Sequence, residues 1–121
     1  MSKTLIIAEA GVNHNGKLSL AKKLIEKASY SGANAIKFQT FKASGILLDK
    51  SLTYTYRSQG KEVKESMYEM FERCEFVDDE WKKIKQKCIE ENILFLSTLN
   101  KIDKSIIYLF PNANLLIIFL S

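Results

Sequence analysis

Four polar residues stand at the ends of apolar runs, and their side chains suit the binding of an anionic small molecule. Glu9 follows TLIIA, Lys37 and Gln39 lie in AIKFQ, and Thr98 ends ILFLST. An ammonium group binds an anion, and each hydrogen bond to a charged group contributes about 1.5–3 kcal/mol. Micromolar affinity needs about 8 kcal/mol, so several such groups must lie together. We predict that these four residues line one substrate-binding site, and we assign no catalytic residue.

The elements that would position the first three of these residues are a strand, a helix and a second strand. Residues 4–8 are apolar and precede a segment rich in Gly and Asn, which is typical of a buried strand followed by a loop. Residues 18–31 repeat apolar side chains at helical spacing, with Ser19 as the candidate N-cap and Gly32 at the C-terminal stop position. Residues 35–39 alternate apolar and polar side chains, as a strand does. A βαβ unit of this kind predicts an α/β fold with a parallel sheet.

The segment after the second strand has no sustained hydrophobic period. Residues 41–65 are therefore predicted to be a long loop, of the kind that forms lids or binding loops. Ser66 and Glu69 have the spacing of a capping box and predict the start of a helix. Asp78 is the candidate cap of another helix, which leads to a third strand at residues 93–98. The inward face of that helix is predicted to carry Trp81, Ile84, Cys88 and Ile89.

Parallel sheets bind ligands beyond the carboxyl ends of their strands, which is where the four polar residues fall. Each also has a plainer interpretation. Lys37 could be an edge residue with its ammonium group in water, and Glu9 could simply end its strand. Ser97 and Thr98 could be a terminating pair or a helix cap. The equivalent places of these residues in successive units favour a shared site.

The chain's only histidine, His14, lies in EAGVNHNG directly after the first strand. A metal site needs several Cys, His or carboxylate ligands, and near His14 the sequence offers only Glu9 and asparagines. Gly11 and Gly16 permit unusual backbone angles, and asparagine hydrogen-bonds locally in turns. We therefore predict a strand-to-helix loop, which His14 either braces or brings to the border of the pocket, and no metal site.

Composition and charge exclude several classes of protein. With 46% hydrophobic and 26% charged residues, the 121-residue chain is too apolar to be disordered. Its net charge of +4 comes from Lys and Arg interleaved with acids, so no nucleic acid is expected as a partner. The apolar tail NLLIIFLS is shorter than the roughly 20 residues of a membrane span. Cys74 and Cys88 lack metal spacing and no export signal is recognised, so a cytoplasmic location is expected.

Four strings, IIAEAGVNHNG, AKKLIEKASYSGANAIKFQT, YEMFERCEF and ENILFLST, together resemble the N-terminal part of the sialic acid synthase family. Its members are phosphoenolpyruvate-dependent synthases of nonulosonic acids such as N-acetylneuraminate and legionaminic acid. The resemblance implies a (β/α)8 TIM barrel, of which this chain would hold about three βα units. It also implies condensation of phosphoenolpyruvate with an N-acylated mannosamine-type sugar, with loss of phosphate. A divalent metal, Mn or Mg, would polarise the sugar aldehyde.

The resemblance also implies roles for the predicted site residues. Lys37 matches the family lysine that binds phosphoenolpyruvate, and Thr98 matches a threonine near the same ligand. Glu9 matches a glutamate that contacts the sugar, and Gln39 lies in the matching KFQT box as a further pocket candidate. The argument from strand ends reached these positions from the residues alone.

The chain departs from the family pattern after Thr98, where it reads STLN in place of STPF. The family's metal ligands are two histidines further along the barrel, and a C-terminal domain of the partner in a homodimer supplies an arginine to the sugar site. We therefore expect residues 1–98 to be the N-terminal part of a barrel and residues 99–121 to be an aberrant tail from a frameshift or a premature stop. Such a chain would be truncated, inactive alone and unable to hold the metal by itself.

A barrel opened after three strands would leave an unpaired strand edge and an uncovered apolar face. The alternative function is therefore a non-catalytic interaction fragment that pairs through this edge, with a full-length synthase or with itself. The sequence alone does not identify the amino sugar that serves as the substrate.

Overall fold

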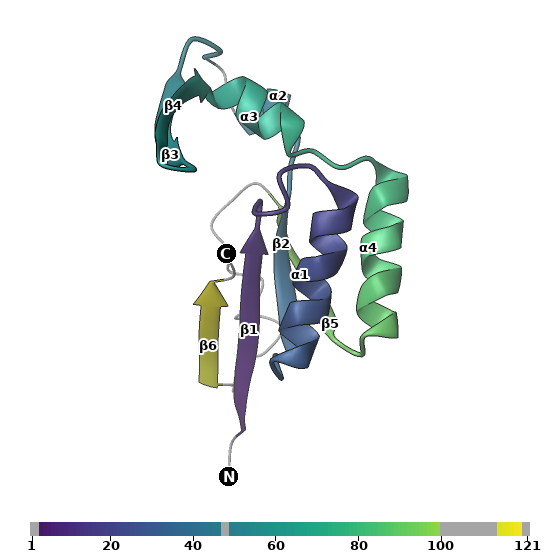
Figure 1. Ribbon diagram of the computed structural model, residues 1–121. Coiled ribbons are helices and arrows are strands. Elements are labelled where there is room, and N and C mark those ends of the chain that lie inside the picture. Colours follow the sequence, from purple (N-terminus) through teal and green to yellow (C-terminus); the bar gives the residue numbers. More distant parts are fainter. Residues whose placement is uncertain (1–2, 47–48, 100–113, 120–121) are drawn as a thin grey trace.

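A sheet of four parallel strands, in the order β5-β2-β1-β6, forms the centre of the protein. The computed structural model describes residues 3–46, 49–99 and 114–119. The strands are β1 (Thr4–Gly11), β2 (Ala35–Thr40), β5 (Leu94–Leu99) and β6 (Asn114–Phe119). The helices α1 (Leu18–Tyr30) and α4 (Asp78–Glu90) cover one face of this sheet (Figure 1). The predicted α/β class, the βαβ unit and the third strand are confirmed.

The two long helices lie on the sheet through their apolar faces. On the sheet side, Ile36 and Phe38 of β2 are fully buried in the core beneath the helices. Burial of a side chain of this size contributes about 1.5–3 kcal/mol. Ile89, which was expected to point inward, is 72% exposed. No helix in the described part of the chain is long and apolar enough to cross a membrane. The helix residues in this core are Ala21, Leu24, Ile25, Ala28, Ile84 and Cys88, with Trp81 partly buried against it.

Both long helices begin differently from the sequence-based expectation. Ser19 is not the N-cap of α1, because the helix starts one residue earlier and its cap, Lys17, makes no side-chain cap hydrogen bond. Asp78 is the first residue of α4 and not its cap. The carboxylate of Glu80 accepts a hydrogen bond from the backbone N–H of Val77 at 3.0 Å. This bond satisfies one of the four backbone donors that a helix start leaves open, and the apolar side chain of Val77 satisfies none of the others.

Residues 41–65 do not form the long loop that was expected. They contain a short helix, α2 (Ala43–Ile46), and an antiparallel hairpin of β3 (Thr53–Ser58) and β4 (Lys61–Ser66). Gln59 and Gly60 connect the two strands with φ angles of 51° and 78°. Two successive positive φ angles are what a two-residue hairpin turn of type I′ requires.

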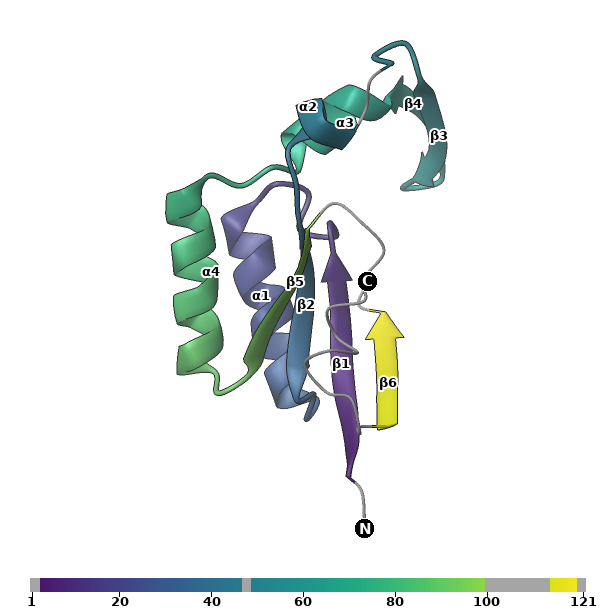
Figure 2. The same ribbon diagram turned by 180° about the vertical axis from the view of Figure 1, so that it is seen from behind.

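Helix α3 (Met67–Arg73) follows the hairpin, and Ser66 caps it as predicted by accepting a hydrogen bond from the N–H of Glu69 at 3.4 Å. We call the described residues from 43 to 76 the arm. Both views show that the arm extends past the carboxyl end of β1 (Figures 1 and 2). The segment expected to be a lid or binding loop is thus a structured projection at that end of the sheet.

Strand β6 pairs with the edge of β1 that does not contact β2, a pairing that the sequence did not predict. The register runs in parallel from Thr4 opposite Asn114 to Glu9 opposite Phe119. In a closed parallel barrel the first strand lies between the second and the last, so β6 takes the edge that belongs to the last strand. Among the described strands, β5 keeps one unpaired edge, as expected for an opened barrel. Residues 100–113 and 120–121 of the expected tail lie outside the described residues.

Candidate functional site

The strand register brings together the four residues that the sequence singled out. Glu9 of β1 and Lys37 of β2 are register partners, and Lys37 Nζ lies 2.6 Å from Glu9 Oε2. Their side chains are 10% and 13% exposed, respectively. Gln39 follows two residues later and is the register partner of Thr98 on β5. The four residues therefore meet at the carboxyl ends of three adjacent strands, while their roles as ligands stay predictions.

A β-bulge shapes the end of β1 at this site. The register with β2 shifts between Glu9 and Gly11, so Ala10 is an extra residue on the β1 side. Gly11 has a φ angle of +53°, which favours glycine. A Cβ atom at Gly11 would lie 3.5 Å from Glu9 Oε1, so the chain turns closely past the carboxylate. Bulges next to functional sites commonly re-aim a side chain, and this one determines how Glu9 meets Lys37.

A pocket of about 400 Å³ opens at this end of the sheet. Its walls are Glu9, Lys37 and Gln39 together with the loop residues 10–13, and Thr98 is not among the lining residues. Within the described part of the chain, no group hydrogen-bonds to the buried Glu9 Oε1. A buried polar atom without a partner costs about 1–3 kcal/mol, and more when it is charged. Glu9 thus lines the pocket and holds a buried oxygen that would gain from any ligand donor that reaches it.

His14 is buried and stiffens the loop that follows β1. Its Nδ1 accepts a hydrogen bond from the N–H of Gly16 at 3.0 Å, which leaves the ring proton on Nε2. The ring packs on Phe76 with centroids 4.3 Å apart. Burial lowers the pKa of His14 to about 4, so the ring is neutral near pH 7. The bracing interpretation is confirmed, and His14 is not among the residues that line the pocket.

The described residues do not fit the divalent metal that the family resemblance implies. Among them, no three side chains of His, Cys, Asp or Glu lie together so that they could hold a metal ion. Cys74 and Cys88 are free and buried, and burial raises the pKa of the Cys88 thiol to about 11. Because thiolates and not thiols bind metals, the Cys88 thiol is a packing group.

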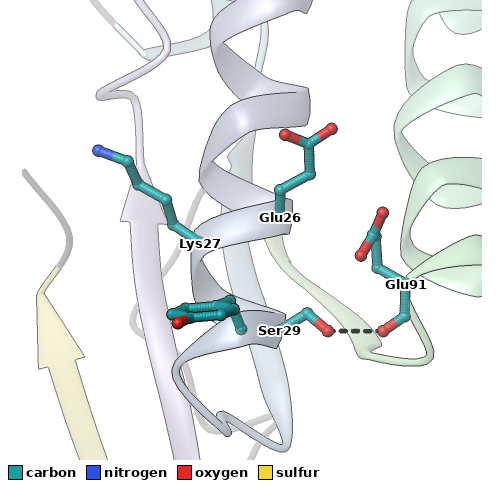
Figure 3. Close-up of a pocket in the computed structure, with 5 residues that line it drawn as sticks. Glu26, Lys27, Ser29 and Glu91 are labelled. Atoms are coloured by element: carbon teal, nitrogen blue, oxygen red, sulfur yellow. Dashed lines mark hydrogen bonds between the residues drawn. The ribbon is translucent and has the colours of Figure 1, made fainter.

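A second pocket, of about 440 Å³, lies between the C-terminal ends of α1 and α4 (Figure 3). Its lining residues are Glu26, Lys27, Ser29, Tyr30 and Glu91. Ser29 Oγ donates a hydrogen bond to the backbone oxygen of Glu91 at 2.7 Å. Lys87 lies 2.9 Å from a carboxylate oxygen of Glu26 and 3.0 Å from one of Glu91. The sequence argument did not single out this pocket, and its paired, solvated charges indicate a contact that joins two helices.

Parallel strands with helices over one face, and polar residues where three of these strands end, are the arrangement of a partial (β/α)8 barrel. The chain belongs to the NeuB family, whose model matches residues 24–109. The matched range therefore continues past Thr98. The resemblance read from the sequence motifs and the barrel-type fold are both confirmed.

Individual relatives support the same assignment. An N,N'-diacetyllegionaminic acid synthase of Campylobacter jejuni is 47% identical over 98 residues, which cover 81% of this chain and 29% of the relative. The protein of the same name from Legionella pneumophila is 40% identical over 93 residues, covering 77% and 26%. The solved structure of the N-acetylneuraminic acid synthetase from Leptospira borgpetersenii has a TM-score of 0.65 at 27% identity, covering 91% and 34%. The chain spans less than a third of the length of the curated relatives named here.

Proposed function

We propose that this chain carries part of the substrate site of a nonulosonic acid synthase. Lys37 would hold an anionic group of phosphoenolpyruvate, and Glu9 would accept a hydrogen bond from an N-acylated amino sugar. The observation that carries the proposal is the buried oxygen Glu9 Oε1, which lacks a hydrogen bond within the described residues and stands beside an ion pair in the pocket. Two relatives are named as synthases of N,N'-diacetyllegionaminic acid, and the acyl groups of that product support an N-acylated amino sugar as the substrate class.

The residues of this chain would bind and orient the two substrates. In the reaction that the family resemblance implies, a carbon–carbon bond forms between phosphoenolpyruvate and the sugar aldehyde, water adds and phosphate leaves. The Lys37 ammonium group would neutralise the approaching anion, with Gln39 and Thr98 as hydrogen-bonding neighbours on the same strand ends. We expect the chain to bind ligands without turning them over, because these groups include no set of metal ligands.

Isothermal titration with phosphoenolpyruvate tests the role of Lys37. The informative variant is the double substitution Glu9→Gln with Lys37→Met, which removes the buried ion pair as a whole and avoids an uncompensated buried charge. Losing a hydrogen bond to a charged group lowers the affinity about 10- to 100-fold. Lys87→Met, at the second pocket, is the matched control and should bind as the wild type does. Equal affinity in all three proteins would contradict the proposal.

Titration with N-acetylmannosamine tests the role of Glu9 separately. Glu9→Gln keeps the size of the side chain but removes the charge that strengthens a hydrogen bond from the sugar. We expect the sugar affinity to fall by about tenfold. An unchanged affinity for the sugar would remove Glu9 from the proposed site.

A second candidate function rests on β5. Among the strands that the structure describes, β5 has one neighbour, β2, and its sequence LFLSTL carries no charge. Edge strands usually protect themselves with charged residues, Pro or bulges, so an uncharged edge favours pairing with another chain. Size-exclusion chromatography with light scattering tests this interaction function. A monomer at every concentration would argue against it.

A further inference from the structure

The arm is joined to the sheet by contacts with the loop between β1 and α1. Both views show the end of α3 near this loop, while the β3–β4 hairpin projects away from the sheet (Figures 1 and 2). An isolated two-stranded hairpin is marginally stable at best in water. Its placement therefore depends on what holds the arm at its base.

The first contact is made by backbone on backbone. Gly16 has a φ angle of +71°, and a Cβ atom placed on it would lie 1.8 Å from the carbonyl oxygen of Arg73, at the end of α3. No side chain can be accommodated at that distance without moving one of the two segments. The loop and the last turn of α3 are therefore in direct contact, and glycine is required there.

The second contact is the stacking of His14 on Phe76. The two rings are tilted by 31°, with centroids 4.3 Å apart, and both residues are buried. Phe76 in turn makes an edge contact with Trp81 of α4 at 5.3 Å between centroids. The His14 ring thus joins the loop to the last residue of the arm, just before α4.

From this base, polar contacts continue to the hairpin. The guanidinium group of Arg73 donates two hydrogen bonds, of 2.8 Å and 3.0 Å, to the carboxylate of Glu65 on β4. The Glu65 carboxylate also lies near Tyr56 on β3 and raises the pKa of its hydroxyl. The ring of Tyr56 stacks on that of Tyr54 at 5.4 Å. A continuous series of contacts therefore connects Gly16 with both strands of the hairpin.

The same loop forms a wall of the candidate pocket. Gly11, Val12 and Asn13 line it, and turn hydrogen bonds of 2.9–3.0 Å link residue 10 to residue 17 in three successive steps. Nδ1 of His14 adds the fourth bond, from Gly16. Because the loop is stiffened along its length, a displacement at the pocket wall is transmitted to His14 and Gly16.

We propose that His14 is a positioning residue that fixes the arm to the pocket loop, so that a ligand in the pocket lined by Glu9 and Lys37 also steadies the hairpin. The imidazole ring packs against Phe76 of the arm, and Nδ1 accepts the hydrogen bond from Gly16 within the loop. The part that concerns the ligand rests on the proposed function, whereas the positioning of the arm does not.

Hydrogen–deuterium exchange of the full chain tests both roles through two matched variants. His14→Asn keeps an acceptor for the Gly16 N–H at the same distance from the backbone but removes the ring. We expect residues 53–66 to exchange about 2- to 10-fold faster, the range that corresponds to one aromatic pair. His14→Phe keeps a ring but removes the acceptor. We expect residues 53–66 to exchange as in the wild type, while the Gly16 amide exchanges faster.

Three further proteins separate positioning from a loss of overall stability. Phe76→Leu keeps an apolar side chain and removes the partner ring, so it should reproduce the effect of His14→Asn on residues 53–66. Tyr30→Ser removes an aromatic ring that is 96% exposed, far from the arm, and should leave the exchange unchanged. Glu65→Gln should speed the exchange of the hairpin residues 53–66 and of no other segment. In each protein, the exchange of β2 (35–40) reports overall stability, and the effect on the hairpin is the acceleration of residues 53–66 beyond that of β2.

The ligand half of the proposal is tested with phosphoenolpyruvate as the probe. If it binds, we expect it to slow exchange of residues 53–66 in the wild type, and this effect should be lost in His14→Asn although binding persists. Binding without any change in residues 53–66 overturns the coupling. If phosphoenolpyruvate does not bind, the proposed function fails, and the ligand-free comparison decides the positioning role. Wild-type exchange of residues 53–66 in both His14→Asn and Phe76→Leu overturns that role.

Discussion

The two pockets of this protein are similar in size but differ in how their charges are placed. The pocket at the carboxyl ends of the strands measures about 400 Å³ and the one between α1 and α4 about 440 Å³. In the first, Glu9 and Lys37 are almost buried, and Glu9 Oε1 has no hydrogen bond among the described residues. In the second, Lys87 has two carboxylate partners, and Tyr30 is exposed. By volume alone, the second pocket would be the preferred ligand site. The buried Glu9 oxygen without a hydrogen bond among the described residues indicates the first pocket instead.

The fold explains this difference. Parallel strands all end at the same edge, so polar side chains from neighbouring strands meet there in a partly desolvated place. The second pocket lies between the ends of two helices, where long charged side chains reach water and pair with one another. Paired surface charges contribute little to stability, and they leave no group that needs a ligand.

The largest difference between the pockets should come from removing one lysine at each. Lys37→Ala leaves the Glu9 carboxylate buried without its partner, so we expect a loss of about 3–5 kcal/mol in the free energy of unfolding. Lys87→Ala should cost several-fold less, because its partners remain hydrated. Urea denaturation followed by circular dichroism measures both. Equal losses would mean that the Glu9–Lys37 pair is no more buried in solution than the surface pair.

Two glycines provide the next comparison, one near each pocket. Gly32 has a φ angle of +82° and open space around it, and it follows α1 at the predicted stop position. Gly32→Ala should cost about 1–2 kcal/mol from the backbone angle alone. Gly16→Ala should cost about 1–3 kcal/mol more, because its new methyl group meets the Arg73 carbonyl. Thermal unfolding of the two variants checks this order, and a reversed order would contradict the contact.

The pH dependence of stability should reveal His14. The pKa of this histidine falls from 6.5 to about 4 on folding. Between these two pH values the unfolded chain binds a proton at His14 and the folded protein does not. Stability is therefore complete above pH 6.5 and is lost as the pH falls toward 4, by up to about 3 kcal/mol. Urea unfolding at several pH values should show this slope in the wild type and a shallower one in His14→Asn. Identical slopes would mean that the His14 ring is exposed to water in the folded protein and that its pKa is not lowered.

The smallest effect is expected at the second pocket. Ser29→Ala removes the hydrogen bond to the Glu91 carbonyl, and a typical net contribution of such a bond is about 1 kcal/mol. Phosphoenolpyruvate binding should not change, because this contact joins two helices. A change in affinity, measured by isothermal titration, would mean that the two pockets are coupled.

Much of the candidate site was predictable from the sequence, because it depends on local rules. Alternation along TLIIAE and AIKFQ places Glu9 and Lys37 on one face, and a βαβ unit implies a parallel pair of strands. The ion pair follows from the register between those strands. The β-bulge at Ala10 was missed, because Gly11 was interpreted as part of a loop and not as the end of a longer strand.

The hairpin had a signal that the sequence analysis did not use. TYTYRS alternates Thr or Arg with Tyr and has strong strand formers, but both faces are polar, so no buried stripe marked it as a strand. Its turn is Gln59–Gly60 in place of the common Asn-Gly, which hid the type I′ signature. The alternation of apolar and polar residues does not identify a strand when neither of its faces is buried.

The pairing of β6 could not be predicted from local pattern at all. NLLIIF is apolar enough for a buried strand, but its partner, β1, lies more than 100 residues earlier in the chain. Nothing in a short window specifies which edge such a strand joins. For this reason the sequence did not predict a fourth strand beside β1.

The parallel direction of β6 has a practical consequence for anyone who purifies this protein. β6 ends at Phe119, opposite Glu9, so the C-terminal side of that strand points to the same edge as the pocket. An affinity tag fused on the C-terminal side of β6 would therefore be attached at the edge that carries the residues whose binding is to be measured. β1 begins with Thr4 at the other end of the sheet (Figure 1), and a tag attached before that strand would keep its charges away from Lys37.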